Sequence, residues 1–218
     1  LGSKFLPSKA SLPLFGAGIS LGGTILINAC LDLGSFSITG KPALDALVCT
    51  SSPLDLAACS KSIERPRNRI YQKWLLQRLI RQTLSDPYGV KYKEEKLLYK
   101  GEIGRSSFIE TIREFDSAIT APRWGFKDVD DYYMNASPVY SLLKNPTLMP
   151  PTLFLQALDD PWVPSSTVKK LADKIDNSSS GSRLNFVLTS KGGHNGFHGI
   201  NGCWGDLLVK NWFLKTKF

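Results

Sequence analysis

A serine between closely spaced glycines is the first feature of this sequence that can carry chemistry. Ser20 lies in Gly18-Ile-Ser-Leu-Gly-Gly23, between an apolar run at residues 12–19 and a segment of helical composition at residues 20–31. A strand, a tight turn and a helix in this order are typical of a nucleophile elbow, which presents the serine hydroxyl at the end of a sheet. The arrangement predicts Ser20 as a nucleophile and the Leu21 amide as one oxyanion-hole donor.

The same glycines admit a second interpretation. Gly16, Gly18 and Gly22 follow an apolar run, as the glycines of a dinucleotide-binding turn do. That site requires an acidic residue at the end of the next strand to bind the ribose. The next apolar run continues into Val48-Cys-Thr-Ser-Ser52 without a carboxylate, so we expect no nucleotide cofactor.

A serine nucleophile needs a base, and the chain contains only two histidines. His194 lies in the glycine-rich segment 191–197, directly after an apolar run at residues 184–189. A histidine in such a loop is often only solvated, but this one follows the last predicted strand, as the order Ser, Asp, His of the hydrolase elbow requires. We therefore predict His194 as the base and interpret His198 as a surface residue.

The carboxylate that would orient this histidine comes from residues 158–164, which follow another apolar run. Asp159 and Asp160 are adjacent there, and such a pair can also be a simple helix-capping turn. Asp160 lies between Ser20 and His194 in the chain, and each of the three follows a predicted strand. This agreement predicts a Ser20–His194–Asp160 triad.

The elements that must position these residues alternate between strand and helix. Such alternation predicts a parallel sheet of the α/β class. We expect buried strands at 12–19, 43–50, 151–157 and 184–189, and a loop at 177–182. We expect helices at 165–175 and 206–214, and one from residue 20 through 31 that ends near Gly34.

The long segment between the second and third predicted strands, residues 59–145, is mostly helical in pattern. We expect it to form a cap inserted over the sheet within a single partial domain, residues 1–218. Residues 61–100 contain eleven Lys or Arg against four Asp or Glu. This excess predicts either a solvated helical face, the interpretation that we favour, or a basic patch that meets phosphates of anionic lipid or nucleic acid.

Composition excludes several classes of protein. The chain has 218 residues, with 42% hydrophobic and 21% charged, which is typical of a globular domain. No apolar run reaches the roughly 18 residues of a membrane span, and the first residues lack a signal-peptide pattern. Four cysteines without a CxxC pair and two histidines predict no metal site. We expect an intracellular location.

Several blocks together are similar to the YheT-like branch of the α/β hydrolases, also called the AB-hydrolase-4 family. They occur in one order along nearly the whole chain: Gly18–Gly23, Pro53–Ser60, Ile70–Leu76, Glu114–Pro122, Asp131–Tyr133, Ala157–Pro161 and Gly192–Phe197. The resemblance implies a triad at Ser20, Asp160 and His194, without cofactor or metal. It implies a carboxylesterase, lipase or phospholipase. The Phe115-Asp116 and Tyr132-Tyr133 pairs belong to the family's cap, where we expect them to serve packing.

The resemblance also implies that the chain begins just before the fifth strand of an eight-stranded sheet. The strand near Leu12 would then be an exposed edge, and the loop that donates the second oxyanion amide would precede the chain. An exposed edge strand invites a partner, such as a separate N-terminal half.

Two functional hypotheses follow. The first is an ester hydrolase acting on a small-molecule or lipid ester, drawn to anionic membrane by its basic cap. The second is a catalytically silent half-domain that serves as a structural or binding subunit of a larger assembly. Nucleic acid is the least favoured partner, because the basic residues are confined to the cap and form no recognised module.

Overall fold

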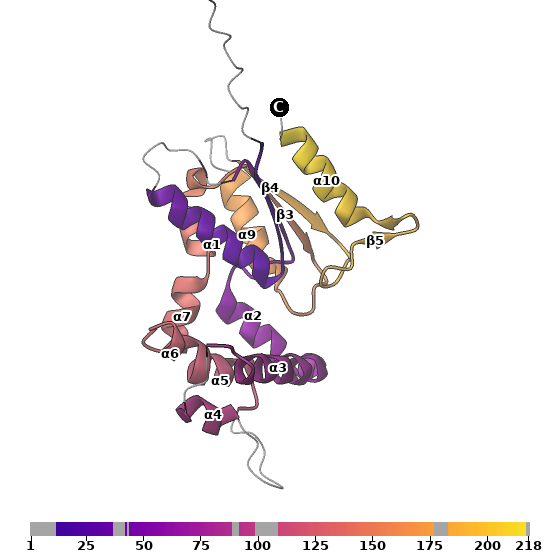
Figure 1. Cartoon of the computed structure of the whole chain (residues 1–218). Helices are drawn as coiled ribbons and strands as arrows, with labels where there is room; N and C mark the ends of the chain where they lie inside the picture. The colour runs from indigo at the N-terminus through magenta and orange to yellow at the C-terminus, as the bar shows by residue number, and fades with distance from the viewer. Residues whose placement is uncertain are drawn as a thin grey trace, which may run out of the picture.

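The computed structural model describes residues 12–36, 42, 44–88, 92–98, 109–176 and 183–216. Four parallel strands form its sheet in the order β1 (Phe15–Ile19), β2 (Ala46–Thr50), β3 (Thr152–Ala157) and β4 (Leu184–Thr189) (Figure 1). Their order in space is their order in sequence. Parallel strands put all four carboxyl ends at one edge of the sheet, and Ser20 directly follows one of them. The predicted α/β class is confirmed.

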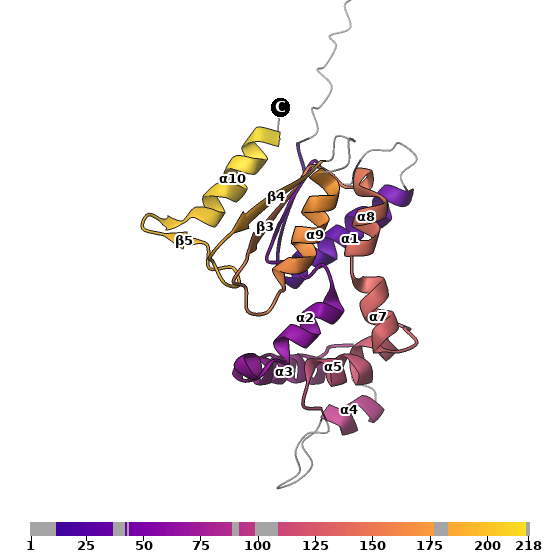
Figure 2. The same cartoon turned by 180° about the vertical axis from the view of Figure 1, so that it is seen from behind.

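Helices cover both faces of the sheet. α1 (Leu21–Phe36), α8 (Val139–Lys144) and α9 (Ser165–Asp176) lie on one face, and α10 (Trp204–Thr216) lies on the other (Figures 1 and 2). Because side chains alternate along a strand, β3 contributes to both layers. Phe154 packs in the cluster with α1, α8 and α9, whereas Leu155 packs with Phe197 near α10.

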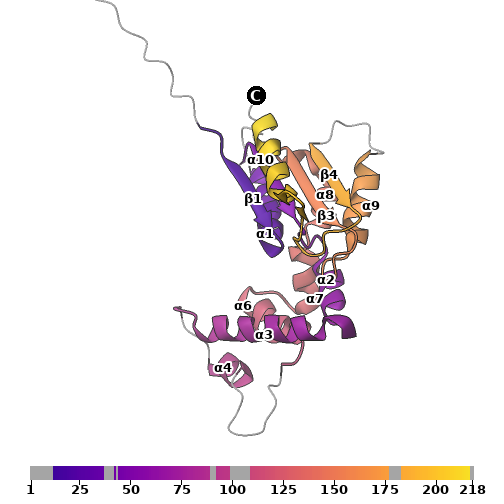
Figure 3. The same ribbon diagram turned by 90° about the vertical axis from the view of Figure 1, so that its right-hand side faces the viewer.

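The helices of the cap lie beyond the carboxyl ends of the strands (Figure 3). Their bounds are α2 (Leu56–Ile63), η1 (Pro66–Asn68), α3 (Arg69–Leu84), α4 (Tyr92–Leu98), α5 (Ile112–Phe115), the π-helical turn η2 (Asp116–Thr120), α6 (Ala121–Arg123) and α7 (Val129–Ala136), and η3 (Pro146–Leu148) leads back to the sheet.

Polar side chains cap the first turns of α2 and α5. The Asp55 carboxylate accepts a hydrogen bond from Ala58 N at 2.9 Å, which starts α2. Thr111 and Glu114 form a reciprocal capping box at the start of α5. Such caps contribute about 1 kcal/mol each. They orient the segments from which the pocket-lining side chains project.

The Arg123 guanidinium connects α6 to the segments around it. It donates to Asp86 Oδ2 at 2.8 Å and to both carboxylate oxygens of Glu94 at 2.9 Å. Paired donors of this kind hold planar carboxylates in a defined geometry. No helix in the described ranges has both the length and the apolarity to cross a bilayer.

The predicted element bounds differ from the observed ones at several ends. β1 begins at Phe15 instead of residue 12, α1 continues to Phe36, and α10 begins at Trp204 instead of Asp206. Sequence patterns missed a small antiparallel hairpin of β5 (His198–Gly199) and β6 (Gly202–Cys203), because two-residue strands carry no periodicity. The predicted loop at 177–182 lies outside the described residues. The cap bounds of 59–145 remain a prediction.

Candidate active site

Ser20 occupies the turn between β1 and α1 in a left-handed backbone conformation, with φ of +51°. A non-glycine residue is strained in that region, at a cost of order 1–3 kcal/mol, and such strain persists where neighbouring structure enforces it. Here Ser20 N donates to Thr50 O of β2 at 2.8 Å, and Gly23 N donates back to Ser20 O at 3.0 Å. The turn therefore holds the serine hydroxyl at the carboxyl edge of the sheet.

Two glycines permit this turn by close approach. A Cβ on Gly18 would lie 2.4 Å from Gly23 Cα, and a Cβ on Gly23 would lie 1.9 Å from Ser52 Oγ. A Cβ on Gly22, in contrast, would meet nothing within 4 Å. The strand and helix thus pack backbone against backbone beneath Ser20.

The three residues predicted as a triad lie together. His194 Nε2 is 3.0 Å from Ser20 Oγ, and His194 Nδ1 is 2.9 Å from Asp160 Oδ2. With Nδ1–H donating to the carboxylate, Nε2 is left to accept the serine proton. The arrangement can activate a hydroxyl for attack on an acyl group.

The Asp160 carboxylate is held from several sides, and its side chain is fully buried. Oδ1 accepts from the backbone amides of Trp162 at 2.9 Å and Val163 at 3.0 Å. Oδ2 accepts from Gln156 Nε2 at 3.1 Å as well as facing His194. These donors give a buried negative charge the hydrogen bonds that it needs.

The neighbouring Asp159 has a different role. Its Oδ1 accepts from Gly193 N at 2.8 Å, which anchors the loop that carries His194. Asn195 N also donates to Ser51 Oγ at 3.3 Å. Asp159 therefore holds the backbone of the loop, and Asp160 holds the side chain of His194 in the same loop. His198, interpreted as a surface residue, is exposed on β5.

Leu21 is the first residue of α1, and its side chain borders the same pocket as Ser20. Amides in the first turn of a helix have no partner within the helix, and the helix dipole makes that end favourable for negative charge. This position suits a donor to an oxyanion. Its role in an oxyanion hole remains a prediction.

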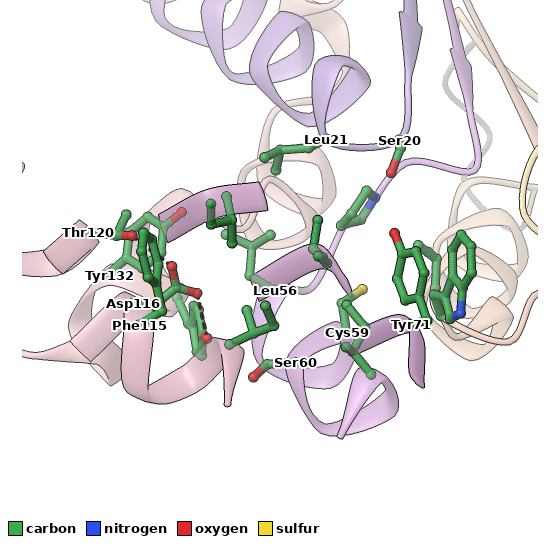
Figure 4. Close-up of a pocket in the computed structure, with 18 of the residues that line it drawn as sticks. Ser20, Leu21, Leu56, Cys59, Ser60, Tyr71, Phe115, Asp116, Thr120 and Tyr132 are labelled. Atoms are coloured by element: carbon green, nitrogen blue, oxygen red, sulfur yellow. Dashed lines mark hydrogen bonds between the residues drawn. The ribbon is translucent and has the colours of Figure 1, made fainter. Parts of the chain in front are cut away.

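A pocket of about 440 Å³ runs from Ser20 and His194 beneath the cap. This volume lies toward the small end of the range of roughly 300–1,000 Å³ that is typical of small-molecule sites. Figure 4 shows Leu21 and Leu56 in its middle part, with Asp116, Thr120 and Tyr132 at the end away from Ser20. Other apolar lining residues are Ile63, Leu75, Leu79, Ile112 and Phe115.

Aromatic rings connect the cap to the histidine. The Trp162 ring lies 4.7 Å from the His194 ring, and Tyr71 of α3 stacks on Trp162 with 3.4 Å between centroids. Burial, with a smaller contribution from the Asp160 charge, raises the pKa of the Tyr71 hydroxyl. Sequence patterns assigned no role to Tyr71 or Trp162. The only signal for Tyr71 was its place in the similar block Ile70–Leu76, and Trp162 directly follows the block that ends at Pro161.

The expectation that Asp116 and Tyr133 serve packing is incomplete. Tyr133 is buried, but its hydroxyl donates to Asp116 Oδ2 at 2.8 Å, and both residues line the pocket. Burial raises the pKa of the Asp116 carboxyl, while hydrogen bonds from Thr120 and Tyr133 oppose that shift. A polar cluster thus lies inside a mainly apolar pocket.

No family model matches the chain, but individual proteins are similar to it over most of its length. Phospholipase ABHD3 of Mus musculus is 33% identical over 192 residues, covering 88% of this chain and 42% of the relative. The putative esterase YheT of Escherichia coli is 31% identical over 210 residues, covering 94% of this chain and 53% of the relative. The chain spans about half the length of the curated relatives that it matches.

Solved structures agree with this fold. The uncomplexed acylaminoacyl peptidase of Pyrococcus horikoshii superposes with a TM-score of 0.51 at 13% identity, covering 95% of this chain and 25% of that one. At this identity the likeness concerns the fold alone. The sheet and its helices correspond to part of an α/β-hydrolase fold.

Proposed function

The chain belongs to the α/β hydrolases, with YheT-like and ABHD3 members among its homologues, and we propose that it is a carboxylic ester hydrolase with Ser20 as its nucleophile. The observation that carries this proposal is the continuous contact from Ser20 Oγ through His194 to Asp160, at 3.0 and 2.9 Å. The names of the homologues, a phospholipase and an esterase, support the reaction class.

In the proposed reaction, Ser20 Oγ bonds to the acyl carbon while its proton passes to His194 Nε2. The negative charge that develops on the carbonyl oxygen faces the Leu21 amide at the start of α1. The bond to the alcohol then breaks, and His194 returns the proton to the leaving oxygen. Water repeats the sequence on the acyl-enzyme and releases the acid. Asp160 keeps the imidazole in the required tautomer and stabilises its charged form.

The substrate class that we propose is a lipid ester, of the acylglycerol or phospholipid type. The pocket below Ser20 is mostly apolar and, at about 440 Å³, is sized for one acyl chain of limited length. Burial of each CH₂ group in such a pocket contributes about 0.8 kcal/mol. An acyl chain can therefore supply the binding energy that places its ester at Ser20.

The test is covalent labelling of the purified chain with a fluorophosphonate, with Ser20→Ala as control. Labelling that disappears in the variant supports an activated serine, and hydrolysis of p-nitrophenyl butyrate by the same preparation extends this to ester cleavage. A folded protein that reacts with neither reagent contradicts the proposal. Folding is checked by circular dichroism and cooperative urea unfolding.

We also propose that the cap meets an anionic lipid surface. Arg65, Arg67 and Arg69 are exposed around the start of α3, next to Ile70, which is 89% exposed, and Trp74, which is 50% exposed. Exposed apolar side chains flanked by basic residues are typical of segments that lie on a membrane surface. Sedimentation with vesicles of phosphatidylserine tests this, because reversing the three arginine charges should release the protein. Unchanged sedimentation contradicts it.

The alternative proposal is a silent half-domain within a larger assembly. Its support is the edge strand β1, which pairs only with β2 among the described strands and leaves Ile19 65% exposed. A groove of about 330 Å³ between this strand and α10 adjoins the edge. If the folded chain shows no labelling, the next experiment is to add a polypeptide that pairs with β1, such as an N-terminal half, and to repeat the labelling.

A further inference from the structure

The apolar pocket ends on a carboxylate. Asp116 Oδ1 accepts a hydrogen bond from Thr120 Oγ1 at 2.7 Å, and Asp116 Oδ2 accepts one from the Tyr133 hydroxyl at 2.8 Å. Figure 4 places Asp116, Thr120 and Tyr132 together at one end of the pocket, with Ser20 at the other and Leu56 between them. We call Asp116, Thr120 and Tyr133 the polar end of the pocket.

Local backbone structure holds this carboxyl in place. Asp116 begins η2, a π-helical turn that ends at Thr120, and turns of this kind occur frequently at functional sites. The capping box of Thr111 and Glu114 fixes the start of the preceding α5. Asp116 therefore faces the pocket as a positioned group.

The donors to Asp116 are neutral. Thr120 donates through a neutral hydroxyl, and burial raises the pKa of the Tyr133 hydroxyl well above its ordinary range, so this donor keeps its proton at neutral pH. No described Lys or Arg forms an ion pair with Asp116, and Arg113, whose guanidinium lies over the Tyr133 ring, pairs with Asp130.

A carboxylate has about four lone-pair sites, and the two donors Thr120 and Tyr133 leave acceptor capacity at the wall of the pocket. A partly buried charge without a counter-ion, such as Asp116, is stabilised by each further hydrogen bond. An acyl chain that ends in a methyl group would cover Asp116 without donating a hydrogen bond to it. A second carboxylate would be repelled.

We propose that the polar end is a subsite for the far end of the acyl chain, and that it favours chains ending in a hydroxyl over chains ending in a methyl or a carboxylate group. This inference rests on the proposed function, because it takes the ester to lie at Ser20. The terminal hydroxyl donates to Asp116, in the same way as Thr120 and Tyr133. The substrate class is thus an ester of an ω-hydroxy acid, with a chain long enough to span the pocket.

The test uses p-nitrophenyl esters of matched length that end in methyl, hydroxyl or carboxylate, over a series of chain lengths. Once the chain is long enough to reach Asp116, kcat/KM for the hydroxyl ester should exceed that for the methyl ester by about 10-fold or more, the value of one hydrogen bond to a charged group. Shorter chains should show no such preference, which gives an internal control.

Substitution of the carboxylate identifies its role. Asp116→Leu should abolish the preference for hydroxyl and raise kcat/KM for long methyl-ended chains, while Asp116→Asn should remove the discrimination against the carboxylate ending. Asp206→Asn, an exposed aspartate on α10, is the matched control and should leave all three ratios unchanged. Equal rates for the three endings at every length, or a preference that survives both Asp116 variants, overturns the inference.

A binding measurement separates this inference from the proposed function. Ser20→Ala removes the nucleophile, and calorimetric titration with the methyl esters of matched fatty and ω-hydroxy acids reads the subsite without turnover. Tighter binding of the hydroxyl form, lost in Ser20→Ala/Asp116→Leu, supports the subsite even if wild type hydrolyses no butyrate ester. Equal affinities overturn it even if butyrate is hydrolysed.

Discussion

The ring of Tyr71 stacks on the ring of Trp162 at 3.4 Å between centroids and 7° between planes, joining cap helix α3 to the loop that carries Asp160. The backbone amide of Trp162 also donates a hydrogen bond to Asp160 Oδ1 in the candidate active site. Its ring adjoins that of His194. We therefore expect the position of the cap to influence the orientation of the histidine.

We expect Tyr71→Ala to slow the reaction of Ser20 with a fluorophosphonate by about 3- to 10-fold, because an aromatic pair contributes about 0.5–1.5 kcal/mol beyond its buried area. The measurement is the second-order labelling rate constant. Tyr140→Ala on α8, where the side chain is 56% exposed, is the matched control. Equal rates in wild type and Tyr71→Ala contradict the coupling.

The adjacent aspartates should differ sharply on substitution. Asp160→Asn should lower kcat by about 10³- to 10⁴-fold, since the wrong tautomer of His194 no longer accepts the serine proton. Asp159→Asn should cost far less, because an amide oxygen can still accept from Gly193 N. Ester hydrolysis over a pH series measures both, and a larger loss in Asp159→Asn would reverse the assignment.

Alanine substitutions at Gly18 and Gly22, on either side of Ser20, should have different effects on the stability of the protein. Gly18→Ala should reduce the free energy of unfolding by about 1–3 kcal/mol, because its Cβ would meet Gly23 Cα at 2.4 Å. Gly22→Ala meets nothing within 4 Å and lies in α1, so it should be neutral or stabilise by up to about 1 kcal/mol. Urea unfolding measures the free energy of unfolding of both variants. Equal values would argue against the close approach of strand and helix.

Asp116 should affect stability in a pH-dependent way. Burial raises its folded-state pKa above the ordinary 3.8, so its ionisation favours the unfolded chain as pH rises through the folded-state pKa. The free energy of unfolding of Asp116→Asn minus that of wild type should therefore increase between about pH 4 and pH 7. Urea titrations at both pH values test this, with Asp206→Asn as the control for an exposed aspartate. A difference that falls with pH would mean that Asp116 is stabilised as the carboxylate.

Sequence alone determined the framework of the candidate site. Glycines on both sides of Ser20, between a strand and a helix, specify a tight turn. Such a turn is determined by residues that are adjacent in the sequence, so the sequence alone predicts it. Asp160 and His194 each follow an apolar run, and parallel strands bring their carboxyl ends to one edge whatever the lengths of the connections. The bounds of β4, Leu184–Thr189, follow from the same pattern.

Only the tertiary structure decided the contents of the cap. The pairing of Tyr71 with Trp162 and of Asp116 with Tyr133 joins residues from separate elements, and no periodicity relates their positions. Asp116 begins the π-helical turn η2, and no pattern in the sequence predicted that turn. Contacts across a folded interface are selected by the packing of whole elements, which a linear pattern of apolar and polar residues does not encode.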